Sequence, residues 1–129
     1  MRSIARAAQA LVVAGMCVIG AAVAQDYPNK PIRFVVPYAP GGASDVTARL
    51  LGQKMTEAWG QTVAVDNRAG ANGLVALQFV AKSLADGYTI LMANLGPNAI
   101  NPAIYSKLPY DPVRDFSAVT LTTLVPNIL

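Results

Sequence analysis

The sequence contains no histidine and a single cysteine, and charged residues make up only 13% of its 129 residues. The absence of histidine excludes metal sites built on imidazole and catalytic groups that need a histidine base. A single cysteine cannot form an intramolecular disulfide, so the fold must be held together by its core. Nucleotide-binding motifs are also missing, because the chain has neither a G-x-G-x-x-G nor a Gly-Lys-Ser/Thr sequence. We therefore expect no cofactor and no metal.

Residues 1–24 have the pattern of a secretory signal peptide. Arg2 and Arg6 start the chain, an apolar stretch covers residues 7–23, and small residues lead up to Ala24. This pattern predicts cleavage after Ala24 and a periplasmic protein. A membrane anchor is the alternative, although the stretch is close to the lower length limit for a span and rich in alanine and glycine.

The charge of the remaining chain argues against a nucleic-acid partner. Removal of residues 1–24 would leave 8 basic and 7 acidic residues, a net charge of +1 in place of +3. Nucleic-acid binding requires a clustered basic face, whereas these basic residues are scattered along the sequence. They are Lys30, Arg33, Arg49, Lys54, Arg68, Lys82, Lys107 and Arg114.

Strand and helix patterns alternate after the predicted signal peptide. Runs of β-branched and aromatic residues predict strands at 32–36, 62–65, 88–93 and 117–123. Helical periodicity predicts a helix capped by Ser44 or Asp45 and ended by Gly60, a second helix around residues 77–84, and a third at 98–105. The alternation predicts an α/β fold with a parallel sheet of βαβ units.

The same periodicity predicts which helix residues enter the core. In the first helix these are Val46, Leu50, Leu51, Met55, Ala58 and Trp59, and in the second they are Leu77, Val80, Ala81 and Leu84. We expect Trp59 to pack in the core rather than to stack on a substrate.

Two loops are predicted to form the walls of a ligand crevice. In an open parallel sheet, ligands bind outside the carboxyl ends of the strands where the strand order reverses. A strand order of 2-1-3 would place the loop Tyr38–Asp45 and the loop Asn94–Asn98 on either side of that point. Gly41 and Gly42 allow a sharp turn into a helix N-terminus, whose free N–H groups can hold a carboxylate.

Ser44 and Asp45 have several possible roles at this helix start. Ser44 could donate a hydrogen bond to an anion, but it has no base to activate it and the surrounding sequence is no nucleophile elbow. Asp45 would repel an anion unless its carboxylate turns inward to cap N–H groups of its own helix, which we favour over ligand contact. The sequence therefore favours a binding protein over an enzyme.

Six segments in this order resemble one family over residues 25–129, the periplasmic receptors of tripartite tricarboxylate transporters, also called Bug or TctC-type receptors. The segments begin at the predicted mature start and continue to the proline-rich connection near the end. They are 27–33 (YPNKPIR), 36–45 (VPYAPGGASD), 66–73 (DNRAGANG), 86–91 (DGYTIL), 99–105 (AINPAIY) and 108–116 (LPYDPVRDF).

The resemblance implies a two-lobed α/β binding protein of the periplasmic-binding-protein type II class. Such a receptor closes on a small carboxylate and delivers it to a membrane permease. In the family, the loops after the first and third strands contact the ligand carboxylate. Carried over to this sequence, the ligand-binding residues are Tyr38, Pro40, Gly41, Gly42, Ala43, Ser44, Asp45, Asn94, Gly96 and Asn98.

The sequence departs from the family pattern in two positions and in length. Asn98 stands where many members have histidine, and Ala69 replaces a frequent proline. Family members are also considerably longer. We therefore expect residues 25–129 to be the N-terminal part of the first lobe, without the second lobe and the C-terminal return, and to bind weakly or not at all alone.

Several alternatives remain open at this point. The chain could be a ligand-sensing domain for a membrane signalling partner, a periplasmic enzyme, or a nonfunctional remnant. Asn67, Arg68 and Asn72 follow the second predicted strand and either stabilise their loop or contact a ligand. Asp111 and Asp115 lie too far from other ligating groups to indicate a metal site.

Overall fold

The computed structural model describes residues 26–124, so the predicted signal peptide lies outside the described residues. Three strands, three α-helices and two short helical turns, η1 of 3-10 type and η2 of π type, make up the described chain. In chain order they are β1 (Ile32–Val36), α2 (Ala43–Trp59), β2 (Val63–Asn67), η1 (Ala71–Gly73), α3 (Leu74–Ala81), β3 (Thr89–Leu91), η2 (Gly96–Ile100) and α4 (Asn101–Ile104).

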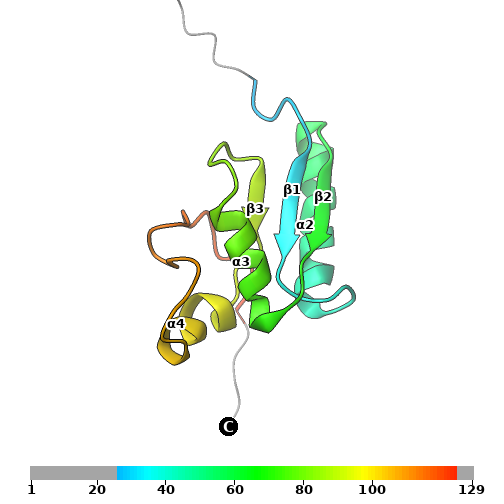
Figure 1. The fold of residues 1–129 in the computed structure, drawn as a ribbon. Coiled ribbons are helices and arrows are strands. Elements are labelled where there is room, and N and C mark those ends of the chain that lie inside the picture. Colours follow the sequence, from blue (N-terminus) through cyan, green and yellow to red (C-terminus); the bar gives the residue numbers. More distant parts are fainter. Residues whose placement is uncertain (1–25, 125–129) are drawn as a thin grey trace, which may run out of the picture.

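The strands form a parallel sheet in the order β2-β1-β3, which confirms the predicted α/β class and is the order on which the crevice hypothesis depends. Phe34 in the central strand faces Val65 on one side and Ile90 on the other. Helix α2 covers one face of the sheet and α3 lies against the opposite face (Figure 1). All three strands point the same way, so their carboxyl ends meet at one edge, near η2 and α4.

Small residues decide which face of α2 packs on the sheet. Ala48 and Gly52 are buried, and a Cβ at Gly52 would lie 3.4 Å from the Val63 side chain. The predicted core face is wrong in part, because Val46 and Leu50 are each 60% exposed. Periodicity locates apolar residues, whereas close packing of a helix on a sheet favours the stripe without bulky side chains. The core on this face consists of Phe34, Val36, Ala48 and Met92, with Leu51, Val63, Val65 and Ile90 packed against it.

Three other residues predicted for the core lie near the surface, and Ala58 is one of them. Trp59 is 43% exposed at the end of α2 and contacts Tyr27 edge to face at 6.4 Å between ring centroids. Leu84 is 80% exposed because α3 ends at Ala81, before the predicted boundary. On the α3 face, Leu77 is fully buried as predicted.

Several boundaries differ from the prediction. Helix α2 begins one residue after Gly42, which occupies the N-cap in place of Ser44 or Asp45, while Gly60 ends the helix in the left-handed conformation as predicted. Strand β2 extends to Asn67, strand β3 is shortened to residues 89–91, and the next helical stretch begins already at Gly96.

The fourth strand predicted at residues 117–123 does not form within the described part of the chain. This segment is exposed, and β3 is hydrogen-bonded to β1 alone among the described strands. A strand needs a partner ladder, so β-branched composition by itself is not sufficient. Within residues 26–124, no helix has the length and apolarity needed to cross a membrane.

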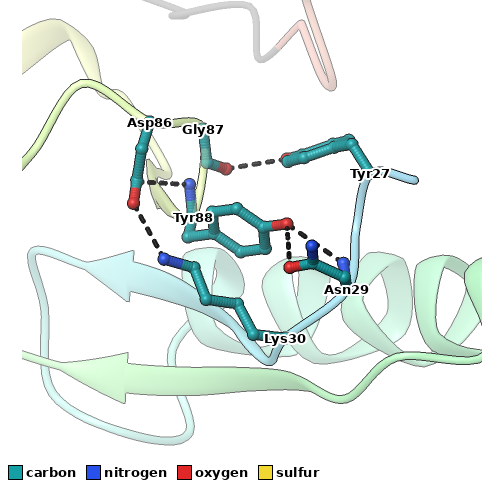
Figure 2. Close-up of polar contacts among 6 residues, drawn as sticks. All are labelled: Tyr27, Asn29, Lys30, Asp86, Gly87 and Tyr88. Atoms are coloured by element: carbon teal, nitrogen blue, oxygen red, sulfur yellow. Dashed lines mark hydrogen bonds and ion pairs between the residues drawn. The ribbon is translucent and has the colours of Figure 1, made fainter. Parts of the chain in front are cut away.

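An aromatic cluster fastens the start of the described chain to the turn before β3 (Figure 2). The Tyr27 hydroxyl donates to the Gly87 carbonyl at 2.8 Å, and the Tyr88 hydroxyl donates to Asn29 Oδ1 at 2.9 Å. Tyr27 and Tyr88 pack edge to face with centroids 5.0 Å apart. We call this cluster the amino-end clamp, made of Tyr27, Asn29, Lys30, Asp86, Gly87 and Tyr88.

Candidate functional site

The two predicted binding loops lie at the carboxyl ends of adjacent strands. The first connects β1 to α2, and the second connects β3 to η2. The loops are joined by one side-chain contact, in which Ser44 Oγ donates to Asn94 Oδ1 at 3.4 Å. The structure therefore brings together the two walls that the sequence placed around a crevice.

Asp45 turns its carboxylate into the protein. The residue is 3% exposed, and its Oδ2 accepts hydrogen bonds from Gly41 N–H at 2.8 Å and from Arg49 Nε at 3.0 Å. The inward orientation agrees with the role favoured from the sequence. The N–H group that Asp45 binds belongs to the preceding loop and not to its own helix, so the carboxylate fixes the glycine turn.

Charge compensation keeps Asp45 ionised. The Arg49 guanidinium, followed by the Gly41 N–H, lowers the pKa of Asp45 from 3.8 to about 2. Arg49 also donates to Asn67 Oδ1 at 3.1 Å, and Asn67 donates to the Tyr38 carbonyl at 3.1 Å. These contacts tie the end of β2 to the first binding loop. They also keep the ionised Asp45 carboxylate on the inner side of that loop, with its charge balanced by Arg49.

A second set of contacts connects the loops after β2 and β3. The Asn72 amide donates to Asn101 Oδ1 at 2.8 Å, and the Asn101 amide donates back to the Asn72 carbonyl at 3.3 Å. Asn101 is fully buried, and Asn72 has a left-handed backbone with φ of 50°. A Cβ at Gly96 would lie 3.3 Å from both the Asn72 amide and the Tyr38 hydroxyl. The hydroxyl and the amide therefore converge on Gly96.

Gly73 allows these loops to approach closely. Its φ is +83°, and a Cβ there would lie 3.0 Å from Pro97 and 3.1 Å from Pro37. Both prolines are buried directly after β1 and within η2. Only glycine fits both the backbone angle and the space, so Gly73 packs all three carboxyl-end loops together.

Asn94 and Asn98 bind each other through local hydrogen bonds. The Asn98 amide donates to the Asn94 carbonyl at 2.9 Å, and Asn94 Nδ2 donates to the Met92 carbonyl at 3.2 Å. Both residues are partly exposed, so the Asn98 side-chain oxygen remains as an acceptor. An asparagine here can accept and donate hydrogen bonds but cannot change charge near neutral pH.

The start of α2 offers N–H donors beside these side chains. No side chain caps the helix at Gly42, and Pro40, Gly41, Gly42 and Ala43 are exposed. The first turn of a 17-residue helix carries unpaired N–H groups and a partial positive charge. This arrangement can hold a carboxylate through backbone groups, without a lysine or arginine in contact.

The two binding loops line neither of two hollows on the surface of the described chain. These hollows have volumes of about 580 and 780 Å³, and none of the ten predicted binding residues contributes to either. Within residues 26–124, no group of three or more histidine, cysteine, aspartate or glutamate side chains gathers to hold a metal ion.

Sequence reasoning missed three residues that organise the site. Arg49 lies four residues after Asp45, a helical ion-pair spacing that could have been noticed. The sequence offered Asn67 either loop stabilisation or ligand contact. In the structure, Asn67 contacts the first loop through the Tyr38 carbonyl. Nothing in the sequence pointed to Asn101, because its partner Asn72 is 29 positions away.

Comparisons with known proteins agree in pointing to one group. The family model described as "Tripartite tricarboxylate transporter family receptor" matches residues 47–129. Protein BugT of Bordetella pertussis is 41% identical over 113 residues, which cover 86% of this chain and 35% of BugT. A UPF0065 protein from the tcbD-tcbE intergenic region of Pseudomonas sp. strain P51 is 44% identical over 103 residues, covering 80% of this chain and 30% of that protein.

Solved structures give the same result. MatC from Rhodopseudomonas palustris with bound malate has a TM-score of 0.70 and 36% identity, over 74% of this chain and 33% of MatC. Rpa4515 of R. palustris with adipate has a TM-score of 0.65 and 40% identity, over 67% of this chain and 29% of that protein. The chain spans about a third of the length of the relatives it matches.

Proposed function

The chain belongs to the tripartite tricarboxylate transporter receptor family, and we propose that it is a periplasmic receptor for a small carboxylate. The matched family is one of receptors, and the related solved structures include periplasmic binding proteins. Two of the structural relatives hold malate and adipate, both dicarboxylates. We therefore take a di- or tricarboxylate as the ligand class and binding, without turnover, as the activity.

One observation carries the proposal for the site. The loops after β1 and β3 meet through Ser44 and Asn94 beside an uncapped helix N-terminus. We assign the carboxylate to the N–H groups of residues 42–44, with the Ser44 hydroxyl as a further donor. The remaining predicted residues shape the crevice: Tyr38, Pro40, Gly41, Asp45, Asn94, Gly96 and Asn98.

The proposal gives Asp45 a supporting task. Its carboxylate holds the Gly41 N–H at 2.8 Å, while Arg49 balances its charge at 3.0 Å. An unbalanced carboxylate at this position would repel an anionic ligand. We assign Asp45 to loop positioning and not to ligand contact.

We extend the proposal to the wider organisation of the protein, and membership of the receptor family supports this step. Residues 1–24 serve as the signal peptide, and residues 25–129 supply the N-terminal part of one lobe of a two-lobed receptor. The receptor delivers its carboxylate to a membrane permease of the tripartite tricarboxylate transporter type. Because a good ligand site buries most of its ligand and the two binding loops line neither surface hollow of the described residues, we expect a Kd on the order of 1 mM for this chain.

A titration monitored by nuclear magnetic resonance tests the site. Malate or adipate added to the 15N-labelled protein should shift the backbone amide signals of residues 41–45, 94–96 and 98 in a saturable manner. The uncharged diamides of the same acids should leave these signals in place, because they lack the carboxylate charge.

Variants at the two loops test whether malate binds at the proposed site rather than elsewhere on the protein. Ser44→Ala together with Asn94→Ala should weaken malate binding several-fold, whereas Ser117→Ala, on an exposed segment away from the loops, should not. Shifts confined to other residues, or a diamide response equal to that of malate, would contradict the proposed site. A micromolar Kd would contradict the expectation of weak binding.

A further inference from the structure

A hollow lies on the α3 side of the sheet, apart from the two predicted binding loops. Its volume is about 780 Å³, and it is lined by the amino ends of β1 and β3, by the outer side of α3 and by Arg68, which directly follows the carboxyl end of β2. We call it the basic groove and define it by six of its lining residues: Lys30, Arg33, Arg68, Phe79, Lys82 and Tyr88.

Cations surround an aromatic ring in the basic groove. The Arg68 guanidinium carbon lies 3.5 Å from the centroid of the Phe79 ring, and that of Arg33 lies 5.5 Å from it. The Asp66 carboxylate holds both guanidinium groups, at 2.9 Å from Arg68 Nε and 3.9 Å from Arg33 Nε. Stacking on Phe79 and shared pairing with Asp66 therefore fix the guanidinium groups of Arg33 and Arg68. Planar guanidinium groups have the donor geometry that suits carboxylates.

The groove has more positive than negative charge. Lys30, Arg33, Arg68 and Lys82 line it, and Asp86 is the one acidic lining residue. Adding Asp66 behind the arginines still leaves four cations against two anions. Lys82 makes no ion pair with any residue between 26 and 124. An occupant with carboxylates would balance this surplus charge.

The helical wall of the groove is a regular stripe. Gln78 and Phe79 each lie three or four residues from Val75 and from Lys82, so the four side chains share the outer side of α3 and its C-cap. Val75 is 44% exposed and Leu84, at the rim, 80%. Arginine, aromatic and aliphatic side chains together are the composition of protein-binding surfaces.

The shape of the groove distinguishes a polypeptide from a small molecule. Small-ligand sites enclose most of their ligand, whereas this hollow is shallow and open along one side. A chain segment can lie along an open groove and place several carboxylates on it. We propose that the basic groove docks an acidic polypeptide segment of a partner protein, with carboxylates on Arg33 and Lys82 and an apolar side chain on Phe79.

A peptide-binding measurement tests this inference on the purified full chain. The probe is a fluorescein-labelled decapeptide in which glutamate alternates with leucine, and its counterpart has lysine in place of glutamate. Fluorescence anisotropy should show saturable binding of the acidic peptide and at least tenfold weaker binding of the basic one. Binding should weaken as the salt concentration rises, because the contacts are partly exposed ion pairs.

Matched charge reversals locate the site. Arg33→Glu combined with Lys82→Glu should weaken binding of the acidic peptide at least tenfold. Lys82→Glu alone should weaken this binding at least threefold. Lys54→Glu and Lys107→Glu change the net charge equally but lie outside the groove, and they should change binding less than twofold. Unchanged circular dichroism and thermal unfolding of Lys82→Glu show that its loss of binding is not a loss of fold.

Four results would overturn the inference. They are equal binding of both peptides, equal effects of groove and control reversals, competition by free glutamate at the same molar concentration as the peptide, and displacement of the peptide by malate. The third result would make the groove a small-anion site, and the fourth would place the peptide in the crevice. Peptide binding that persists with saturating malate supports the groove whether or not the carboxylate proposal holds.

Discussion

The two ends of the sheet use hydrogen bonds in opposite ways. At the amino ends of β1 and β3, the amino-end clamp pairs its polar atoms with one another: the Tyr27 hydroxyl with the Gly87 carbonyl, and the Tyr88 hydroxyl with Asn29. At the carboxyl ends, the loop residues 40–43 are exposed and the helix N-terminus has no side-chain cap. Hydrogen-bond donors that have a partner within the chain stabilise the fold. Donors without such a partner can bind a ligand.

The residue types at the two ends follow this division. The Tyr27 ring packs edge to face on Tyr88 within the clamp and on Trp59 beside it, with centroid distances of 5.0 and 6.4 Å. The crevice end instead uses glycine and asparagine, which bring backbone groups close together and supply short amides. The crevice end therefore depends on backbone geometry, and the clamp depends on side-chain contacts. Four predictions test this difference.

The largest expected effect is at the backbone of the crevice end. Gly73→Ala forces a side chain into a left-handed position within 3.2 Å of Pro97 and Pro37. Conformational strain and overpacking together should lower the free energy of unfolding by about 3 kcal/mol. Gly60→Ala is the control, because it shares a positive φ but has open space around it, and should cost about 1 kcal/mol. Denaturant unfolding measures both, and equal losses would remove the role given to close packing.

A buried amide should matter more than an exposed one. Asn101→Ala leaves the Asn72 amide without its 2.8 Å acceptor and should destabilise the fold by about 2 kcal/mol. The matched change at the clamp, Asn29→Ala, removes one exposed hydrogen bond, that from the Tyr88 hydroxyl to Asn29 Oδ1, and should cost about 0.5 kcal/mol. Thermal unfolding compares the two variants. A larger loss from Asn29→Ala would reverse the comparison.

Weakening the clamp should leave the crevice unchanged. Tyr88→Phe removes a hydroxyl that donates to Asn29 Oδ1 and accepts from the Asn29 N–H, and should cost about 1 kcal/mol. The amide signals of residues 41–45 should keep their positions, since the clamp lies at the other end of the strands. Shifts at these amides comparable with those at residues 27–29 would show that the two ends are coupled.

The smallest expected effect is on how steeply stability falls with pH in acid. Asp45 has a folded-state pKa of about 2, below its ordinary value of 3.8, so its contribution to stability is complete above pH 3.8 and is lost as the pH falls through about 2. Asp45→Asn should reduce the slope of the unfolding free energy against pH in acid. The reduction should correspond to at most about one bound proton. Asp111 also has a pKa lowered to about 2, by Arg114, so Asp111→Asn is the comparison variant. An unchanged acid slope in Asp45→Asn would contradict its assigned pairing.

Local patterns predicted much of this fold. The strand 32–36, the glycine that ends α2 and the parallel α/β class follow from β-branched runs, turn residues and alternation of elements. The two loops of the crevice were also predicted, because they follow adjacent parallel strands. Ser44 and Asn94 do meet there, 50 positions apart in the sequence.

Other features could not be obtained from local patterns. Periodicity favoured Val46 and Leu50 for the core, but the space beside the sheet accepts Ala48 and Gly52. Composition predicted a strand at residues 117–123, but this segment pairs with neither β2 nor β3, the edge strands of the described sheet. Both errors have one cause, since helix face and strand pairing depend on neighbours that are distant in sequence.

The sequence by itself determined the class of the protein: an α/β chain without histidine, with a glycine turn before a helix and the motifs of a carboxylate receptor family. Tertiary structure alone decided how that turn is held, through Asp45, Arg49 and Asn67, and how Asn101 joins the loop of Asn72. It also gathered scattered basic residues around Phe79. Residue types and spacing govern local conformation, whereas packing and charge pairing depend on which segments the fold brings together.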